Sequence, residues 1–167
     1  MLEFFLKVLS PGDMLVYSSH GLFGWLIKKK TYSDYTHVAV YVGGGKQREF
    51  REWNGAQEVP LRIKDLVMVR SPKGSWSRAK SDELWDKVKD QGYDYLGLFW
   101  SFIAVRSGAS NKRMFCSEYY ARDHAYSVDG EPLFSEDTDA DRVSPADCVR
   151  SSGTKLKWKK RDEKLES

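Results

Sequence analysis

A pair of β-rich runs separated by three glycines most constrains the fold of this 167-residue chain. The segment reads THVAVYVGGGKQREFREW (residues 36–53), with β-branched and aromatic residues on both sides of Gly43, Gly44 and Gly45. Glycine accepts the positive φ angles of tight turns, so this pattern predicts an antiparallel hairpin. A phosphate-binding loop is the weaker interpretation, because no helix with P-loop or dinucleotide-binding spacing follows the glycines.

Helical and strand patterns surround this hairpin. The predicted helices are a short amphipathic one before Pro11, one within 20–31, one within 77–92 with Ser81 as its N-cap, one of about three turns from near Cys116, and a short one at Ser144. Further strands are expected over 14–17, within 58–72 up to Pro72, and over 154–160, with 93–105 packed inside and 129–141 as an acidic loop. This order predicts an α+β domain with an antiparallel sheet.

Length and composition restrict the class of protein. At 167 residues and 41% hydrophobic content the chain fits one globular domain, and no apolar run approaches the ~20 residues of a membrane-spanning helix. Two cysteines are too few for a disulfide scaffold, which predicts a reducing compartment. The net charge of +3 equals the six Lys or Arg less the three Asp or Glu of residues 151–167, so we expect a solvated basic tail and no nucleic-acid partner.

Cys116 is the candidate nucleophile. It stands at the start of the helix predicted in RMFCSEYYARDHAY (residues 113–126), and a helix N-terminus beside a histidine is the usual way to lower the pKa of a thiol. Glu118 would oppose this effect if it faced the sulfur, but two helical steps turn it away, and we expect it to cap the helix. Taken alone, a single cysteine is more often a buried core residue than a nucleophile.

His37 is the candidate base. It lies on the predicted strand 37–41, and a strand covered on both faces can bury such a residue against a helix. His20 precedes a glycine in a loop, and His124 lies about two turns beyond Cys116 on the same helix, so both are poorer candidates.

A carboxylate on the next strand would fix the imidazole tautomer, as in a Cys-His-acid triad. Glu49 and Glu52 both follow the glycine turn and point to opposite faces of the strand. Glu52 shares its face with Phe50, which favours Glu52 as the inward residue and leaves Glu49 as the alternative. A solvated surface glutamate is the other interpretation of either.

These candidates fall within a wider pattern. The segments GDMLVY, SDYTHVAVYVG, REWNGAQEVPL, GYDYLGLF and FCSEYYA resemble the permuted NlpC-type, papain-like cysteine hydrolases, and especially the YiiX-like amidase group. The cysteine segment follows the histidine segment, as in the permuted branch. The implied fold is a single papain-like domain over 1–167, with a core of about 11–151 and a basic tail at 152–167. Its nucleophile helix would pack against a central antiparallel sheet or partial barrel.

The resemblance also implies the roles of individual residues. It makes Cys116 the nucleophile, His37 the base and Glu52 the orienting acid, with no metal and no cofactor. Tyr93 matches the tyrosine that lines such sites, and its hydroxyl is a candidate second donor to the oxyanion, beside the backbone N–H of Cys116.

The implied function is cysteine hydrolase activity on an amide or ester bond through a thioester acyl-enzyme. The expected substrate is a cell-wall peptide or a lipid-like amide or ester, and Trp25, Trp53 and Trp100 are aromatic residues that could contact it or lie in the core. The lack of a basic leader with a small-residue cleavage site predicts a cytoplasmic protein, with a phage particle or lysis as the route to a wall substrate.

Two other interpretations stay open. A papain-like domain can serve as a binding or virion structural module without turnover, in which the same side chains survive as packing. A zinc site could be built from Cys116, Cys148 and the histidines, but close-set ligand pairs such as C-x-x-C are absent from the sequence.

Overall fold

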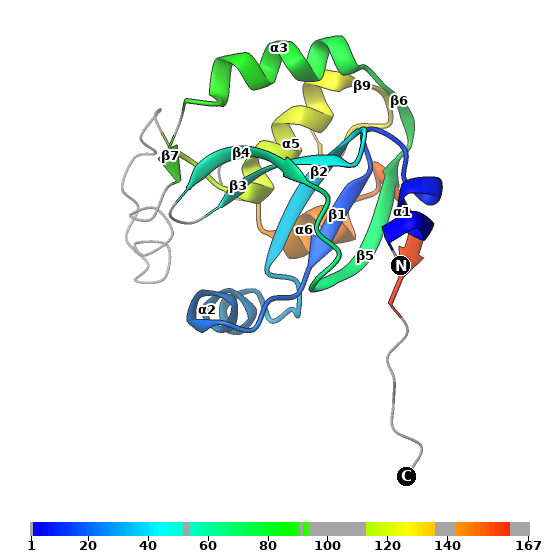
Figure 1. Ribbon diagram of the computed structural model, residues 1–167. Coiled ribbons are helices and arrows are strands. Elements are labelled where there is room, and N and C mark those ends of the chain that lie inside the picture. Colours follow the sequence, from blue (N-terminus) through cyan, green and yellow to red (C-terminus); the bar gives the residue numbers. More distant parts are fainter. Residues whose placement is uncertain (1, 52–53, 91, 94–112, 136–142, 161–167) are drawn as a thin grey trace.

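The computed structural model describes residues 2–51, 54–90, 92–93, 113–135 and 143–160 (Figure 1). In chain order the elements are α1 (Leu2–Val8), β1 (Met14–Tyr17), α2 (Leu22–Thr31), β2 (His37–Gly43), β3 (Lys46–Arg51), β4 (Gly55–Pro60), β5 (Leu66–Pro72), β6 (Gly74–Trp76), α3 (Arg78–Val88), β7 (Gly92–Tyr93), β8 (Arg113–Met114), α5 (Cys116–Ser127), β9 (Val128–Gly130), α6 (Pro145–Arg150) and β10 (Thr154–Lys159). The α+β class predicted from the sequence is confirmed. Among these described elements, none of the helices combines the length and apolar character needed to cross a bilayer.

Six strands form one antiparallel sheet in the order β10-β5-β1-β2-β3-β4. The predicted glycine hairpin joins β2 to β3, and its three glycines have φ angles of +89°, +60° and +70°. At the opposite edge β10 pairs with β5. The edge strand expected over 154–160 is thus confirmed as β10, which lies within the segment assigned to the basic tail.

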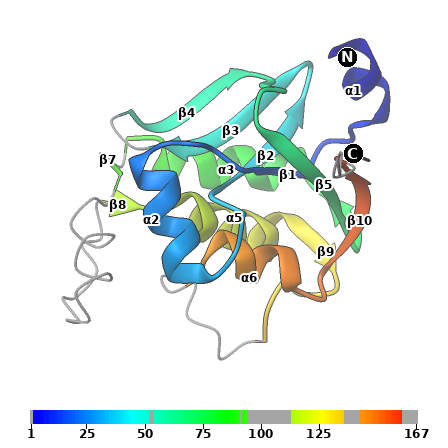
Figure 2. The same cartoon turned by 90° about the horizontal axis from the view of Figure 1, so that it is seen from below.

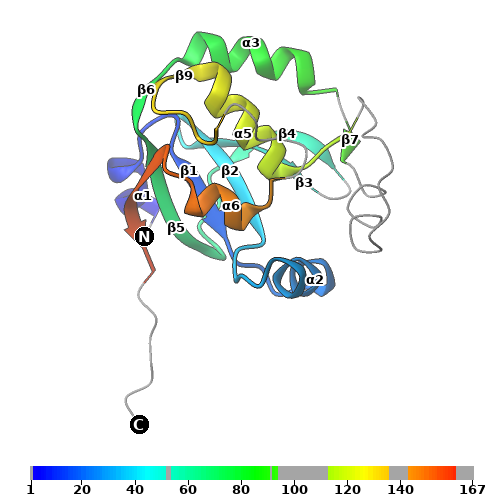
Figure 3. The ribbon, with the colours of Figure 1, turned by 180° about the vertical axis from the view of Figure 1, so that it is seen from behind.

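The two faces of the sheet bury different clusters. One face carries Met14, Val16, Val38, Val40 and Phe50, which pack with Tyr119 and Tyr120 of α5 and with Cys148 of α6. Figure 3 shows α5 and α6 lying over this face. The other face carries Leu15, Tyr17, Ala39 and Tyr41 and packs with Phe5 of α1 and with Trp158. Burial on both faces means that polar side chains on the central strands need partners inside the protein.

Helix α5 begins at Cys116 because its first turn is capped. The backbone N–H of Phe115 donates to the Glu118 carboxylate (3.3 Å), which confirms the predicted capping role of Glu118. The Glu118 carboxylate also forms an ion pair with Arg122, one turn later in α5 (2.8 Å), so it is directed along the helix. Nine of the twelve residues of α5 are buried, so the helix packs as a rigid support against β2 and β3.

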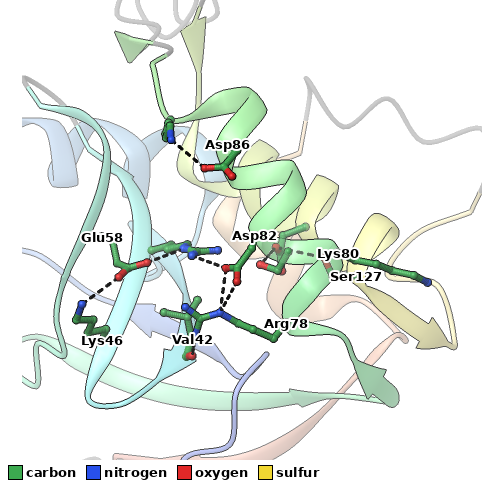
Figure 4. Close-up of polar contacts among 12 residues, drawn as sticks. Val42, Lys46, Glu58, Arg78, Lys80, Asp82, Asp86 and Ser127 are labelled. Carbon is green, nitrogen blue, oxygen red and sulfur yellow. Dashed lines mark hydrogen bonds and ion pairs between the residues drawn. The ribbon is translucent and has the colours of Figure 1, made fainter.

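Helix α3 is attached to the sheet by charged pairs (Figure 4). Arg48 of β3 bridges Glu58 of β4 (2.9 Å) and Asp82 of α3 (2.6 Å). Arg78 also pairs with Asp82 (2.9 Å) and donates to the carbonyl of Val42. These contacts hold α3 against strands β3 and β4, on the face of the sheet that α5 also covers.

The predicted N-cap of α3 is wrong. The cap is Ser77, whose hydroxyl accepts the Lys80 N–H (3.4 Å), because the helix begins one turn earlier than the sequence pattern indicated. Ser81 lies inside the helix, fully buried, and donates to Asp123 of α5 (2.5 Å). Its role is to join two helices.

Candidate active site

His37 and Glu49 meet where β2 begins beside β3. The His37 Nε2 and Glu49 Oε2 atoms are 2.7 Å apart, and the side chains are 12% and 1% exposed. Two neighbouring strands of one hairpin carry the pair, so the ladder of the sheet sets the positions of both backbones.

The described carboxylate on His37 is that of Glu49, the alternative in the sequence interpretation, while Glu52, the favoured residue, lies outside the described residues. The preference for Glu52 came from its shared face with Phe50. That face packs against Tyr119 of α5, with ring centroids 5.2 Å apart, whereas His37 projects from the opposite face of the sheet. A strand buried on both faces gives no signal as to which face is the functional one.

Cys116, in the first turn of α5, affects the pKa of the His37 imidazole. Burial lowers the pKa of His37, but charge and hydrogen bonding from the Cys116 sulfur, with a hydrogen bond from Glu49, more than offset this and raise the pKa to about 9. The imidazole therefore interacts with the Cys116 sulfur and, through Nε2, with the Glu49 carboxylate.

Two further side chains hold Glu49. Its Oε2 also accepts hydrogen bonds from Gln47 Nε2 (3.1 Å) and Arg62 Nη2 (2.5 Å). Burial raises the pKa of Glu49, but the hydrogen bond and charge of His37 and the charge of Arg62 outweigh burial and hold it below its usual value. Sequence reasoning missed both residues. The two-residue spacing of β3 places Gln47 on the face of Glu49, but Arg62 follows β4 in an irregular segment that has no periodic signal.

Tyr93 is placed only through its backbone. Its short strand β7 pairs in parallel with β8, so Tyr93 lies opposite Met114, two residues before Cys116. The backbone of Tyr93 therefore lies close to the start of α5. The role of the Tyr93 hydroxyl at the oxyanion stays a prediction.

The remaining histidines and the second cysteine lie elsewhere. His20 is exposed, whereas His124 is buried and contacts the Gly153 carbonyl through Nε2 (3.3 Å). Cys148 is fully buried, its sulfur lies 3.8 Å from the Ser117 carbonyl, and burial raises the pKa of its thiol. Within the described part of the chain, no three His, Cys, Asp or Glu side chains gather as metal ligands.

A cavity of about 340 Å³ opens near the His37 end of β1 and β2. It is lined by Ser19, His20, Gly21, Trp25 and Lys28, where the chain enters α2. The Ser19 N–H and hydroxyl bond the Thr36 hydroxyl (2.9 and 2.8 Å), and Thr36 immediately precedes His37. Trp25 is 54% exposed and so is no core residue, while Trp53 and Trp100 lie outside the described residues. Figure 2 shows α2 on the same side of the molecule as β8, which leads into α5.

The described residues form an α+β protein with a six-stranded antiparallel sheet, and His37 and Glu49 are paired at one end of its central strands. No family model matches the chain. The crystal structure of the metalloprotein YiiX from Escherichia coli O157:H7 superimposes with a TM-score of 0.67 at 18% sequence identity, covering 92% of this chain and 98% of YiiX. The chain therefore has the YiiX fold, and the resemblance predicted from the sequence is confirmed at that level.

A curated protein is also similar in sequence. The probable lipoprotein peptidase YaeF of Escherichia coli K12 is 31% identical over 110 residues, which are 61% of this chain. The match spans 40% of the length of YaeF, so the two proteins share one region and not their whole architecture. The chain is thus a distant relative of a probable peptidase and carries the fold of YiiX.

Proposed function

We propose that this protein is a thiol hydrolase that cleaves an amide or ester bond through a thioester on Cys116. The observation that carries the proposal is the position of His37, which interacts with the Cys116 sulfur and, through Nε2, with the Glu49 carboxylate. This is the arrangement that activates a cysteine for nucleophilic attack. The distant relation to a probable peptidase is consistent with it.

In the first half of the reaction the Cys116 thiolate attacks the carbonyl carbon, and a sulfur–carbon bond forms as the carbonyl oxygen becomes an oxyanion. The backbone N–H of Cys116 is one donor to that oxyanion, and the Tyr93 hydroxyl is the proposed second donor. The oxyanion collapses, His37 gives its proton to the leaving nitrogen or oxygen, and the bond to that atom breaks. The acyl group remains on sulfur as a thioester.

In the second half His37, now neutral, takes a proton from water as the water oxygen attacks the thioester carbon. The sulfur–carbon bond breaks, the acid product leaves, and the thiolate with its imidazolium is restored. Glu49 keeps the imidazole in one orientation through both halves, because Nε2 stays bonded to its carboxylate.

The lining of the cavity beside α2 suits a substrate that carries an apolar or sugar surface and a negatively charged group. Trp25 offers a ring face and Lys28 a cation, and both line the cavity near His37. A peptide with a free carboxylate and an N-acyl amino acid both fit this description, so peptide and lipid-like amides are the substrate classes to test.

A second candidate is an inert papain-like binding or structural module. One observation favours it: Cys116 is only 4% exposed, which is typical of a packed cysteine. The two functions differ in the reactivity of the sulfur, which is measurable without any knowledge of the substrate.

The test is the rate of iodoacetamide labelling of Cys116, followed by intact mass from about pH 5 to about pH 10. A hydrolase predicts rapid labelling well below about pH 8.5, the pKa of a free thiol, and a fall of at least about tenfold in His37→Ala. Cys116→Ser shows how much label goes to the buried Cys148. Slow labelling that His37→Ala leaves unchanged would support the inert module. Incubation of the active protein with purified peptidoglycan or with N-acyl amino acids, followed by mass spectrometry, then assigns the substrate.

A further inference from the structure

We propose that Arg62 is a positioning residue that fixes the Glu49 carboxylate against His37 and neutralises part of its charge, so that His37 can both release and accept a proton. This inference rests on the proposed thiol hydrolase function and concerns a residue outside the three reacting groups. It is carried by the contacts of Arg62 with Glu49, Gln47 and Tyr17.

The side chain of Arg62 closes the network from the solvent side. It comes from the segment between β4 and β5 and is 32% exposed, whereas the Glu49 side chain beneath it is 1% exposed. Its Nη2 donates to Glu49 Oε2 (2.5 Å), and its guanidinium lies 5.1 Å above the centre of the Tyr17 ring. The Tyr17 ring in turn packs against the His37 ring, with centroids 5.7 Å apart. The cation is thus held by a carboxylate and a π face.

The backbone of Arg62 orients a second partner of Glu49. The Arg62 N–H donates to Gln47 Oε1 (3.0 Å), and a backbone N–H can only donate. The Tyr17 hydroxyl donates to the same oxygen (2.7 Å). Gln47 must therefore turn its amide nitrogen toward Glu49, where Nε2 lies 3.1 Å from Oε2. Arg62 acts on Glu49 twice, directly through its guanidinium and indirectly through Gln47.

The charges of this network determine how tightly His37 holds its proton. The ionisable groups around His37 are Cys116 from α5, Glu49 and Arg51 from β3, Tyr17 from β1, and Arg62 from the segment after β4. With Arg62 in place, one buried carboxylate is shared between two cationic partners, so His37 feels only part of its negative charge. Without Arg62 the carboxylate would lose its ion pair with this cation and would hold the proton of His37 more tightly.

A proton held too tightly would slow turnover. His37 must give its proton to the leaving group and then, as a neutral base, take one from water. By limiting the hold of Glu49 on that proton, Arg62 keeps both steps accessible near neutral pH. Its role is to position and tune, and it needs no contact with the substrate.

The experiment compares labelling of Cys116 by iodoacetamide as a function of pH in four proteins: wild type, Arg62→Met, Arg62→Lys and Arg70→Met. Wild-type labelling should change as His37 loses its proton near pH 9. In Arg62→Met this change should move upward by about one pH unit, because the neutralising charge is lost. Arg62→Lys retains a cation and should stay close to wild type.

Arg70→Met is the matched control. Arg70 lies on β5 of the same sheet, and its side chain hydrogen-bonds Thr154 of β10. It lies opposite Met14 of β1, at the end of β1 that is remote from His37. Its profile should overlay that of wild type. If Arg62→Met does not fold, as judged by circular dichroism, Arg62→Gln carries the same test, since it is neutral but still offers a donor to Glu49.

The outcomes separate this proposal from the proposed function. A folded neutral Arg62 variant whose profile matches wild type, or shifts downward, overturns the role of Arg62 and leaves the hydrolase intact. Wild-type labelling that is slow and insensitive to His37→Ala counts against the hydrolase itself.

Discussion

Replacement of Glu49 by glutamine tests which glutamate serves His37. Glu49→Gln keeps the shape of the side chain and a carbonyl oxygen beside Nε2, but it removes the negative charge that the structure places 2.7 Å from that nitrogen. Glu52→Gln is the matched variant at the position that the sequence pattern favoured. Glu49→Gln should lower the pKa of His37, and Glu52→Gln should leave it unchanged.

The size of the shift follows from Coulomb's law. Two unit charges about 4 Å apart interact by about 4 kcal/mol at an effective dielectric constant of about 20, which corresponds to about three pKa units. The amide oxygen of glutamine still accepts a hydrogen bond, which retains part of this stabilisation of the imidazolium. We therefore expect the pKa of His37 to fall from about 9 in the wild type by about two units.

The direction of the pH shift follows from the loss of the proton on His37. The imidazolium persists below its pKa and is lost as pH rises through it, so the wild type keeps the charged pair up to about pH 9. In Glu49→Gln the pair should disappear about two units lower. The assay is the pH dependence of Cys116 alkylation by iodoacetamide, with circular dichroism to verify folding. A Glu49→Gln profile that overlays the wild type, together with a shifted Glu52→Gln profile, would refute the reasoning.

Two further predictions concern stability and use urea denaturation. Gly12→Ala should lower the free energy of unfolding by about 2–4 kcal/mol, because Gly12 has a φ of +91° and a Cβ there would lie 2.5 Å from the Trp76 ring. The control is Gly21→Ala, which has open space around its Cβ position and should change the free energy of unfolding by less than about 1 kcal/mol. Equal effects at both positions would contradict this account. Asp123→Ala should cost about 2–4 kcal/mol, because the buried carboxylate accepts hydrogen bonds from three side chains of its surroundings, and exposed Asp129→Ala should change stability by less than about 0.5 kcal/mol. A mild Asp123→Ala variant would mean that water or neighbouring groups satisfy those donors.

Local signals in the sequence predicted most elements of the fold. The glycine run determined the β2–β3 hairpin, and Ser144 with Pro145 marked the start of α6. The start of α5 at Cys116 followed from the acid in its first turn. Each of these features depends on residues within a few positions of one another, which is why pattern reasoning can find them.

The errors arose where tertiary contacts decide between equivalent local patterns. Ser77 and Ser81 are both suitable caps, and only the pairing of β6 with β9 fixes where α3 begins. The sequence also left Glu49 and Glu52 as alternatives, and of the two the structure describes only Glu49, which contacts His37. Arg62 carried no signal at all, because its contacts join an irregular segment to two strands, β3 and β1.

The order of the elements along the chain has a consequence for biosynthesis. The imidazole and its carboxylate lie on the early hairpin, while the sulfur arrives on a helix near the end, and β10, the last strand, completes the opposite edge of the sheet. A partly translated polypeptide therefore presents an ordinary thiol or none. Under the proposed function, the reactivity of the Cys116 thiol should appear only after α5 has packed against the early hairpin, so this reactivity would report completed folding.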